Sequence, residues 1–308
     1  MENDELNAIT SDNHAPAPSA LLTPRVLVPL SLIGVYLIWG STYLAIRIAL
    51  ADYPPFLMGA IRFFIAGVLM FVVLRWRGIA APTRAQWFNC AITGTLLLGF
   101  GNGLVCYAEQ TVASGLAAVA VASMPLFAAL CAGFYRQWPT RIETLGLLVG
   151  FGGVVLLNFG GDLRGSPLGA LALIGASATW AFGSVWSRRR DMPHPAMSTA
   201  AQMLCGSAVL GLVALLAQER IVAVHLESTL ALAYLLVAGS ILGFSAYIYL
   251  LHHVRPAVAT SYAYVNPPVA VLMGVMFGGE SVRLLDLIGM AVILTGVAAI
   301  TLTKAKKS

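Results

Sequence analysis

The stretch VLVPLSLIGVYLIWGSTYLAI, residues 26–46, decides the fold class because it is apolar, uncharged and long enough to cross a membrane as a helix. About 20 apolar residues in an α-helix cover the roughly 30 Å of hydrocarbon in a bilayer. Nine similar stretches follow, at residues 55–74, 86–107, 111–134, 141–158, 167–187, 195–217, 229–251, 256–277 and 283–302. Gly and Pro inside them are compatible with membrane helices, because neighbouring helices satisfy the freed backbone groups.

The composition agrees with this interpretation. Of the 308 residues, 59% are hydrophobic and only 10% are charged, whereas about a quarter of the residues in a soluble protein are charged. The mean hydropathy is +0.84. We therefore predict an all-α integral membrane protein with ten transmembrane helices.

The distribution of Lys and Arg predicts the orientation. If the N-terminus lies inside, most of the 18 Lys and Arg residues fall in inner segments. Cytoplasmic loops are enriched in these residues, so we place both termini in the cytoplasm. Residues 1–25 are polar and acidic and predict a disordered cytoplasmic tail, and residues 304–308 predict a short basic tail. The net charge of +5 follows from this bias and indicates no nucleic-acid partner.

The two halves of the chain repeat one another at a nearly constant separation. The matched pairs include Trp39 and Trp180, Pro125 and Pro267, and Gly153 and Gly296. Each half, residues 26–158 and 167–303, contains five predicted spans. Because five is odd, the second half enters the membrane from the opposite side, so the repeats are inverted. Inverted repeats around a central site are the design of alternating-access transporters. A duplication that only enlarges the helix bundle is the alternative.

Seven stretches along the chain carry a family resemblance. They are IWGSTYLAIR at residues 38–47, PPFLMGAIRF at 54–63, GNGLVCYAE at 101–109, SGLAAVAVASMPLFAAL at 114–130, WAFGSV at 180–185, PAVATSYAYVNPPVAVLMG at 256–274 and GGE at 278–280. In this order and spacing they resemble the drug/metabolite transporter superfamily, EamA type, over nearly the whole chain after the N-terminal tail. The resemblance implies ten helices in two repeats and export of small metabolites, often amino acids, through the inner membrane.

Polar and aromatic side chains inside the spans are the candidates for a substrate cavity. Polar groups are costly in lipid, so they face the bundle interior and mark transport pathways. We expect the cavity to be lined by Trp39, Thr42, Tyr43, Arg62, Asn102, Tyr107, Ser123, Trp180, Ser184, Ser245, Tyr249, Tyr262 and Asn266. The alternatives are interfacial anchoring for the aromatic residues and hydrogen bonds between helices for the hydroxyl residues.

Arg62 and three prolines suggest how a substrate is held. Arg62 lies well inside a predicted span and can bind a substrate carboxylate through two hydrogen bonds, or its side chain can extend to the outer surface instead. Pro125, Pro267 and Pro268 predict helix breaks at matching places in the two halves. Carbonyls freed by such breaks can accept hydrogen bonds from an ammonium group. A packing kink is the alternative.

The function follows from what the spans hold and lack. No Asp or Glu falls near the middle of a span, whereas proton-driven pumps place such relays in the membrane. We therefore predict a facilitated exporter of small neutral or zwitterionic metabolites, amino acids above all, acting with small molecules and membrane lipids. A sugar nucleotide or phosphate ester would need several convergent Arg or Lys residues, and the spans hold one.

Other classes remain as alternatives. A lipid flippase and a multidrug or metabolite exporter with proton antiport both stay open. A passive pore lacks the ring of like charges it would need, and an intramembrane enzyme lacks a catalytic set. The four cysteines fall inside spans without a CxxC pattern, so we expect free thiols, no metal and no cofactor. A monomer can suffice, and the sequence leaves the oligomeric state open.

Overall fold

The computed structural model describes residues 23–112, 120–157, 166–221, 223–278 and 284–302. The predicted tails, apart from residues 23–25, lie outside this range. The described residues are helical and contain no β-strand, which confirms the predicted all-α class.

The helices follow the predicted spans closely. They are α1 (Pro24–Ala49), α2 (Pro55–Trp76), α3 (Arg84–Gly94), η2 (Thr95–Asn102), α4 (Gly103–Ala108), α6 (Met124–Phe134), α7 (Arg141–Leu157), α8 (Pro167–Ser187), α9 (Pro195–Leu216), α10 (Leu226–Tyr234), η3 (Leu235–Phe244), α11 (Ser245–His253), α12 (Pro256–Ala259), α13 (Tyr262–Gly278) and α14 (Leu284–Leu302). Six continuous helical stretches among the described residues are long and apolar enough to cross a membrane. The full count of ten stays a prediction.

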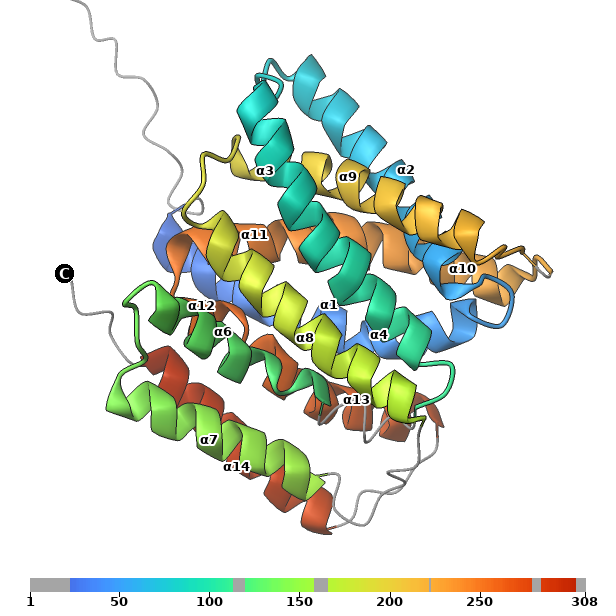
Figure 1. The fold of residues 1–308 in the computed structure, drawn as a ribbon. Helices are drawn as coiled ribbons and strands as arrows, with labels where there is room; N and C mark the ends of the chain where they lie inside the picture. Colours follow the sequence, from blue (N-terminus) through green and yellow to red (C-terminus); the bar gives the residue numbers. More distant parts are fainter. Residues whose placement is uncertain (1–22, 113–119, 158–165, 222, 279–283, 303–308) are drawn as a thin grey trace, which may run out of the picture.

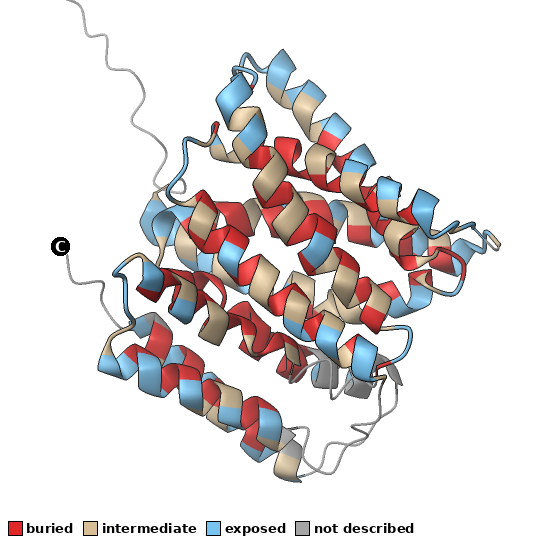
Figure 2. Cartoon of the chain, in the orientation of Figure 1, coloured by how far each residue is buried: buried red, intermediate tan, exposed pale blue. Residues whose placement is uncertain are grey.

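Large apolar side chains cover the outward faces of these helices. Leu30, Phe134 and Leu215 are each more than half exposed, and exposed residues recur along the outer sides of α2, α7 and α9 in Figure 2. A soluble protein rarely exposes such extensive apolar surface. The outward faces are therefore suited to contact lipid.

Matching helices of the two halves pack against each other in opposite directions. A Cβ added to Gly59 of α2 would contact Leu210 of α9, and one added to Gly67 would contact Leu204, so residue numbers rise on one helix as they fall on the other. The pair α2 and α9 forms one side of the bundle, and the pair α7 and α14 the opposite side (Figure 1). This antiparallel pairing is the geometry of inverted repeats.

Glycine allows α7 and α14 to approach until their backbones touch. A Cβ on Gly296 would lie 2.5 Å from the backbone nitrogen of Gly150 and 2.7 Å from the carbonyl oxygen of Gly146. Small residues permit such contact between membrane helices, where dispersion forces replace the hydrophobic effect as the source of helix association. The pair is therefore held by close backbone packing.

Replacing Gly296 with alanine should loosen this contact. We predict that Gly296→Ala lowers the free energy of unfolding by about 1–3 kcal/mol, because backbone atoms cannot move aside as a flexible side chain can. The measurement is the unfolding temperature of the detergent-purified protein. Gly152→Ala is the matched control, since a Cβ there meets nothing within 4 Å. Equal unfolding temperatures for the two variants would contradict the proposed role of the contact.

Helix interruptions lie next to Pro125 in the first half and ahead of Pro267 in the second half. Turn residues interrupt the helix immediately before α6, where Pro125 lies in the first turn. In the second half, Pro267 and Pro268 lie inside the continuous helix α13, and the break falls earlier, between α12 and α13 at residues 260–261.

Hydroxyl side chains add hydrogen bonds at the second break. Thr260 Oγ1 donates to the carbonyl of Pro256 at 2.9 Å, and Ser261 Oγ donates to the carbonyl of Val258 at 2.7 Å. Both carbonyls also accept backbone N–H groups, from Thr260 and Ser261. The two prolines are accommodated without a turn.

The matching third and eighth spans each contain a π-helical segment. These segments, η2 and η3, fall in the middle of the continuous helices Arg84–Ala108 and Leu226–His253. π-Helical turns are rare and occur mostly at functional sites. Both segments border the cavity described below.

Candidate functional site

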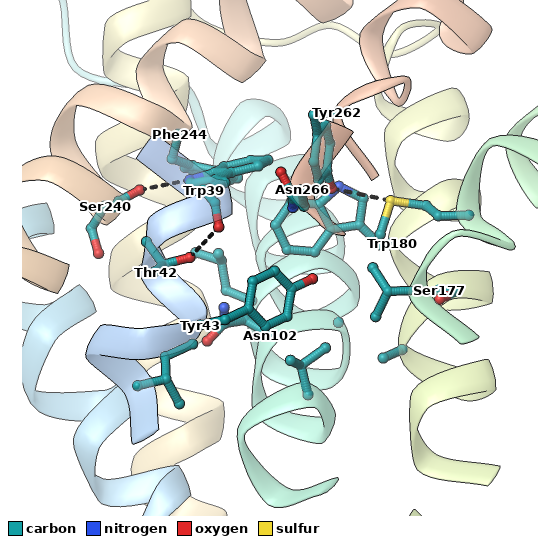
Figure 3. A pocket seen from close by; sticks show the side chains of 18 of the residues that line it. Trp39, Thr42, Tyr43, Asn102, Ser177, Trp180, Ser240, Phe244, Tyr262 and Asn266 are labelled. Carbon is teal, nitrogen blue, oxygen red and sulfur yellow. Dashed lines mark hydrogen bonds between the residues drawn. The ribbon is translucent and has the colours of Figure 1, made fainter. Parts of the chain in front are cut away.

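A cavity lies between the two halves and is lined by both (Figure 3). Its walls come from α1, α2, η2, α4, α6, α8, η3, α13 and Val121. The lining residues are Trp39, Thr42, Tyr43, Ile46, Arg62, Phe63, Leu98, Gly101, Asn102, Val105, Val121, Met124, Ala176, Ser177, Trp180, Gly239, Ser240, Phe244, Tyr262 and Asn266. The space open to a water-sized molecule is about 80 Å³. At roughly 10–15 Å³ for each water, this is room for a small metabolite.

A cluster of aromatic rings forms part of the cavity wall. The ring of Trp39 lies 5.5 Å from that of Trp180, 5.2 Å from that of Tyr247 and 4.6 Å from that of Tyr262. Most of these pairs meet at steep angles, the arrangement that aromatic quadrupoles favour. Trp39 Nε1 also donates to the carbonyl of Gly239 at 3.0 Å, which fixes the indole against η3. We call Trp39, Trp180, Phe244, Tyr247 and Tyr262 the aromatic cluster.

Arg62 supplies the positive charge in the cavity. It is 3% exposed, and it donates from Nη2 to Asn102 Oδ1. Its guanidinium carbon lies 4.4 Å from the centre of the Phe63 ring. Arg62 is the only charged residue among those that line the cavity. The side chain therefore does not extend to the surface, which was the alternative interpretation of the sequence.

Eight of the predicted cavity residues line this space. They are Trp39, Thr42, Tyr43, Arg62, Asn102, Trp180, Tyr262 and Asn266. Each half contributes to the set, and the equivalent residues Trp39 and Trp180 contact each other edge to face.

The other five predicted residues lie elsewhere. Tyr107 stacks on Phe56 at 6.0 Å, and Tyr249 stacks on His253 at 3.9 Å. Their placements fit the alternative of anchoring near a helix end. Ser123, Ser184 and Ser245 also lie outside the cavity lining.

Two of these serines satisfy hydrogen bonds between or within helices. Ser184 Oγ forms a hydrogen bond of 2.7 Å with the hydroxyl of Tyr247, a member of the aromatic cluster. Ser123 Oγ donates to the carbonyl of Ala120. Sequence reasoning missed the apolar lining residues such as Leu98, Val121 and Met124. No sequence signal separates them from the lipid-facing residues of the same helices.

Arginines tie the two halves together at the end of the bundle where α1 begins. Arg255 Nη1 lies 2.8 Å from Glu143 Oε2, and Arg255 Nη2 donates to the carbonyl of Trp138 at 3.1 Å. Arg189 Nη2 donates to the carbonyl of Tyr135 at 3.2 Å. Glu143 is fully buried, whereas the side chain of Arg255 is 27% exposed. These contacts join the two halves at this end of the bundle.

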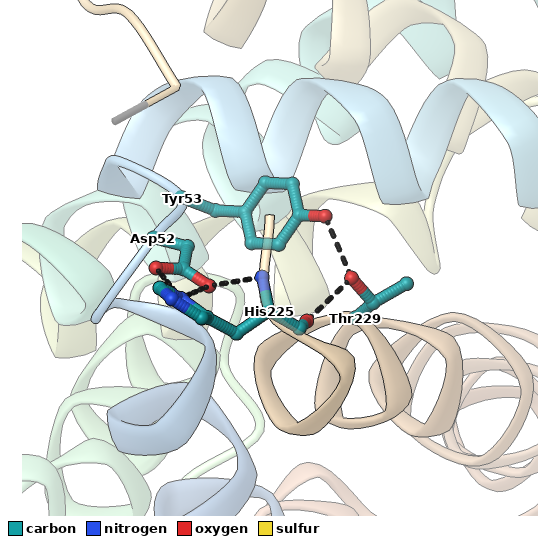
Figure 4. A network of polar contacts seen from close by, with 4 residues as sticks. All are labelled: Asp52, Tyr53, His225 and Thr229. Atoms are coloured by element: carbon teal, nitrogen blue, oxygen red, sulfur yellow. Dashed lines mark hydrogen bonds and ion pairs between the residues drawn. The ribbon is translucent and has the colours of Figure 1, made fainter. Parts of the chain in front are cut away.

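A second network joins the halves at the opposite end, where α1 gives way to α2 (Figure 4). Asp52 accepts from the backbone N–H of His225 at 2.9 Å and contacts His225 Nδ1 at 2.9 Å. Tyr53 Oη lies 3.1 Å from Thr229 Oγ1. The backbone hydrogen bond, and then the ring hydrogen bond, hold the pKa of the Asp52 carboxyl below its usual value. The network keeps Asp52 ionised and the two loops together.

Glu109 follows α4 and lies near both Arg47 and Arg62. It is half-buried as a residue, but its Oε1 is shielded and has no hydrogen-bond partner among the described residues. Burial raises the pKa of the Glu109 carboxyl to about 8, against the opposing effect of Arg47 and Arg62. Asn102, Cys106 and Glu109 share one helix face at i, i+4 and i+7 spacing. This face leads from the cavity towards the end of the bundle where α1 gives way to α2.

The raised pKa predicts a pH-dependent stability. Between the usual Glu pKa and about 8, the folded state binds a proton that the unfolded state has released, so stability falls as pH rises through this window. We predict that Glu109→Gln, which carries no charge, unfolds at a temperature a few degrees above wild type at pH 8.5 and close to wild type at pH 5. The measurement is thermal unfolding in detergent at both values. A constant difference at both pH values would show that burial of the charge is not its cause.

The described residues contain no group of three or more His, Cys, Asp or Glu side chains that could hold a metal ion. The arrangement is instead that of a binding cavity between two membrane-embedded halves. Such a fold and cavity define the class of helical membrane transporters.

Comparison with known proteins agrees with this class. The EamA-like transporter family matches residues 27–159 and again residues 167–302. The chain is 42% identical over 284 residues to the uncharacterized inner membrane transporter YedA of Escherichia coli (strain K12), covering 91% of this chain and 93% of YedA. It is 25% identical to the WAT1-related protein At3g02690, chloroplastic, of Arabidopsis thaliana, covering 86% and 67%. A solved crystal structure superposes with a TM-score of 0.75 at 23% identity, covering 89% of this chain and 97% of that one.

The chain therefore belongs to the EamA-like transporter family, with the family domain present twice. The relatives named as transporters support a membrane transport role, and YedA supports a multi-pass inner-membrane location.

Proposed function

We propose that this protein is a secondary transporter that exports small neutral or zwitterionic metabolites, with amino acids as the favoured class. It works by alternating access, without obligatory proton coupling. The observation that carries the proposal is the cavity between two antiparallel halves, because both halves contribute walls and each is tied to the other at both ends. Relative motion of such halves exposes a central site to one compartment at a time.

The lining supports the substrate class. Aromatic rings and neutral hydroxyl and amide groups dominate it, with one cation, Arg62. Apolar surface with a few placed polar groups is typical of small-molecule sites. One guanidinium matches one carboxylate, whereas a phosphate ester would draw on several cations. The small volume favours amino acids with aliphatic side chains over larger compounds.

The test is counterflow of radiolabelled L-leucine in proteoliposomes. We predict saturable counterflow for wild type and a loss of about tenfold or more for Trp39→Ala, because the indole lines the cavity and bonds to Gly239 on η3. Trp76→Ala is the matched control, since Trp76 is 90% exposed on the outward face. Flux that rises linearly with concentration would favour a pore. No counterflow across a panel of labelled amino acids would contradict the proposal and leave the flippase interpretation.

Glu109 supports a second candidate, export by proton antiport. A shielded carboxyl group with a pKa of about 8 exchanges protons in the physiological range, and its charge acts on Arg62 in the cavity. Intramembrane proton relays use carboxylates in this way. The facilitated mechanism is the leading proposal because Glu109 does not line the cavity.

A pH gradient distinguishes the two mechanisms. With the leucine gradient held fixed, facilitated export predicts that collapsing the proton gradient changes the flux by less than about twofold. Proton antiport predicts a larger fall for wild type that is absent in Glu109→Gln. The readout is the initial efflux rate from proteoliposomes with and without a protonophore.

A further inference from the structure

Two buried polar side chains in the cavity wall, one from each half, keep unused hydrogen-bonding atoms. Arg62 and Asn266 are each 3% exposed, and both line the cavity. Arg62 Nε and Asn266 Oδ1 have no hydrogen-bond partner among the described residues. A buried polar atom without a partner is costly, so atoms of this kind in a cavity wall indicate a ligand that completes them.

One of the two atoms is a hydrogen-bond donor and the other is an acceptor. Arg62 Nε is a donor on a charged group, and among the described residues Asn102 accepts a hydrogen bond from Nη2 of the same guanidinium. Nε is therefore available to a carboxylate, which a guanidinium can bind through two parallel hydrogen bonds. Asn266 Oδ1 is an acceptor and suits the N–H of an ammonium group.

The two residues also belong to different halves. Arg62 lies on α2 of the first half and Asn266 on α13 of the second half. The aromatic cluster and apolar residues such as Met124 occupy the wall of the same cavity. In Figure 3, Asn266 lies among Trp180 and Tyr262, on the side of the cavity away from Asn102, the hydrogen-bond partner of Arg62.

We propose that Arg62 and Asn266 form a two-ended site for an α-amino acid, in which Arg62 binds the carboxylate, Asn266 binds the ammonium group and the aromatic cluster contacts the side chain. The inference deepens the proposed transport function and rests on it for the physiological role. The ligand bridges the two halves, so an analogue that lacks either end loses its contact with one of them.

Binding in detergent tests the assignment separately from transport. The probes are L-leucine, 3-methylbutylamine, which lacks the carboxylate, and 4-methylpentanoate, which lacks the ammonium group. For wild type we expect L-leucine to bind at least tenfold more tightly than either analogue by isothermal titration calorimetry.

Each variant should weaken the binding of only those probes that carry the group it contacts. Arg62→Gln should weaken L-leucine and 4-methylpentanoate about tenfold or more and leave 3-methylbutylamine unchanged. Asn266→Leu should weaken L-leucine and 3-methylbutylamine and leave 4-methylpentanoate unchanged. Arg62→Lys keeps the charge and should lie between wild type and Arg62→Gln, which preserves the test if Arg62→Gln does not fold. Arg220→Gln, at an exposed arginine outside the cavity, is the charge-matched control and should change nothing.

Distinct outcomes overturn the two proposals. The two-ended site is overturned if L-leucine does not bind wild type, or if the variants weaken all three probes equally or weaken none. The transport proposal alone is overturned if the probes divide as expected but proteoliposomes show no counterflow.

Discussion

Backbone contact between matching antiparallel helices is the constraint on which the structure depends. In lipid, apolar side chains gain little by leaving the solvent, so helices associate through close packing and hydrogen bonds. Gly146, Gly150 and Gly296 bring α7 and α14 into such contact, and Gly59 and Gly67 bring α2 against α9. These two pairs form opposite sides of the bundle. The helices between them then have space to carry large aromatic side chains around a cavity.

The polar groups that line the cavity destabilise the fold, which indicates that they serve to bind a ligand. Arg62 is a buried cation whose Nε has no hydrogen-bond partner among the described residues, and a buried polar atom without a partner destabilises a fold. Hydrophobic residues of similar size would pack there at lower cost. The negatively charged ligand proposed above would complete the guanidinium, in surroundings where the low dielectric strengthens the contact. The same low dielectric explains why the nearby Glu109 retains its proton up to a pH of about 8.

The sequence predicted the helical architecture well because each span is a local property of length and hydropathy. The predicted spans agree with the described helices to within a few residues at most ends, and the matched pair Trp39 and Trp180 meets in the cluster. Polar character led to the prediction that Arg62, Asn102 and Asn266 line the cavity, because polar side chains are costly in lipid and face the bundle interior.

The predictions of residue placement that differ from the structure depend on how the helices pack. Tyr249 and Ser184 have the same residue types as residues that line the cavity, but Tyr249 stacks on His253 of its own helix and Ser184 bonds to Tyr247. Which face of a helix borders the cavity is set by the neighbouring helices, which a single sequence does not describe. The break in the second half was placed at Pro267 because proline lacks a donor, whereas it lies at Thr260 and Ser261. The π-helical segments η2 and η3 carry no proline and left no signal in the sequence.

The two halves match in backbone but differ in charge, and this difference bears on how a ligand is released. The position that matches Arg62 in the second half is Ala201, a buried and uncharged residue. In the proposed alternating-access cycle the guanidinium stays on α2, so a ligand held by its carboxylate would keep that contact as the halves move. Separation of α2 from Asn266 on α13 would then lower the affinity. On this proposal the second half sets the release step.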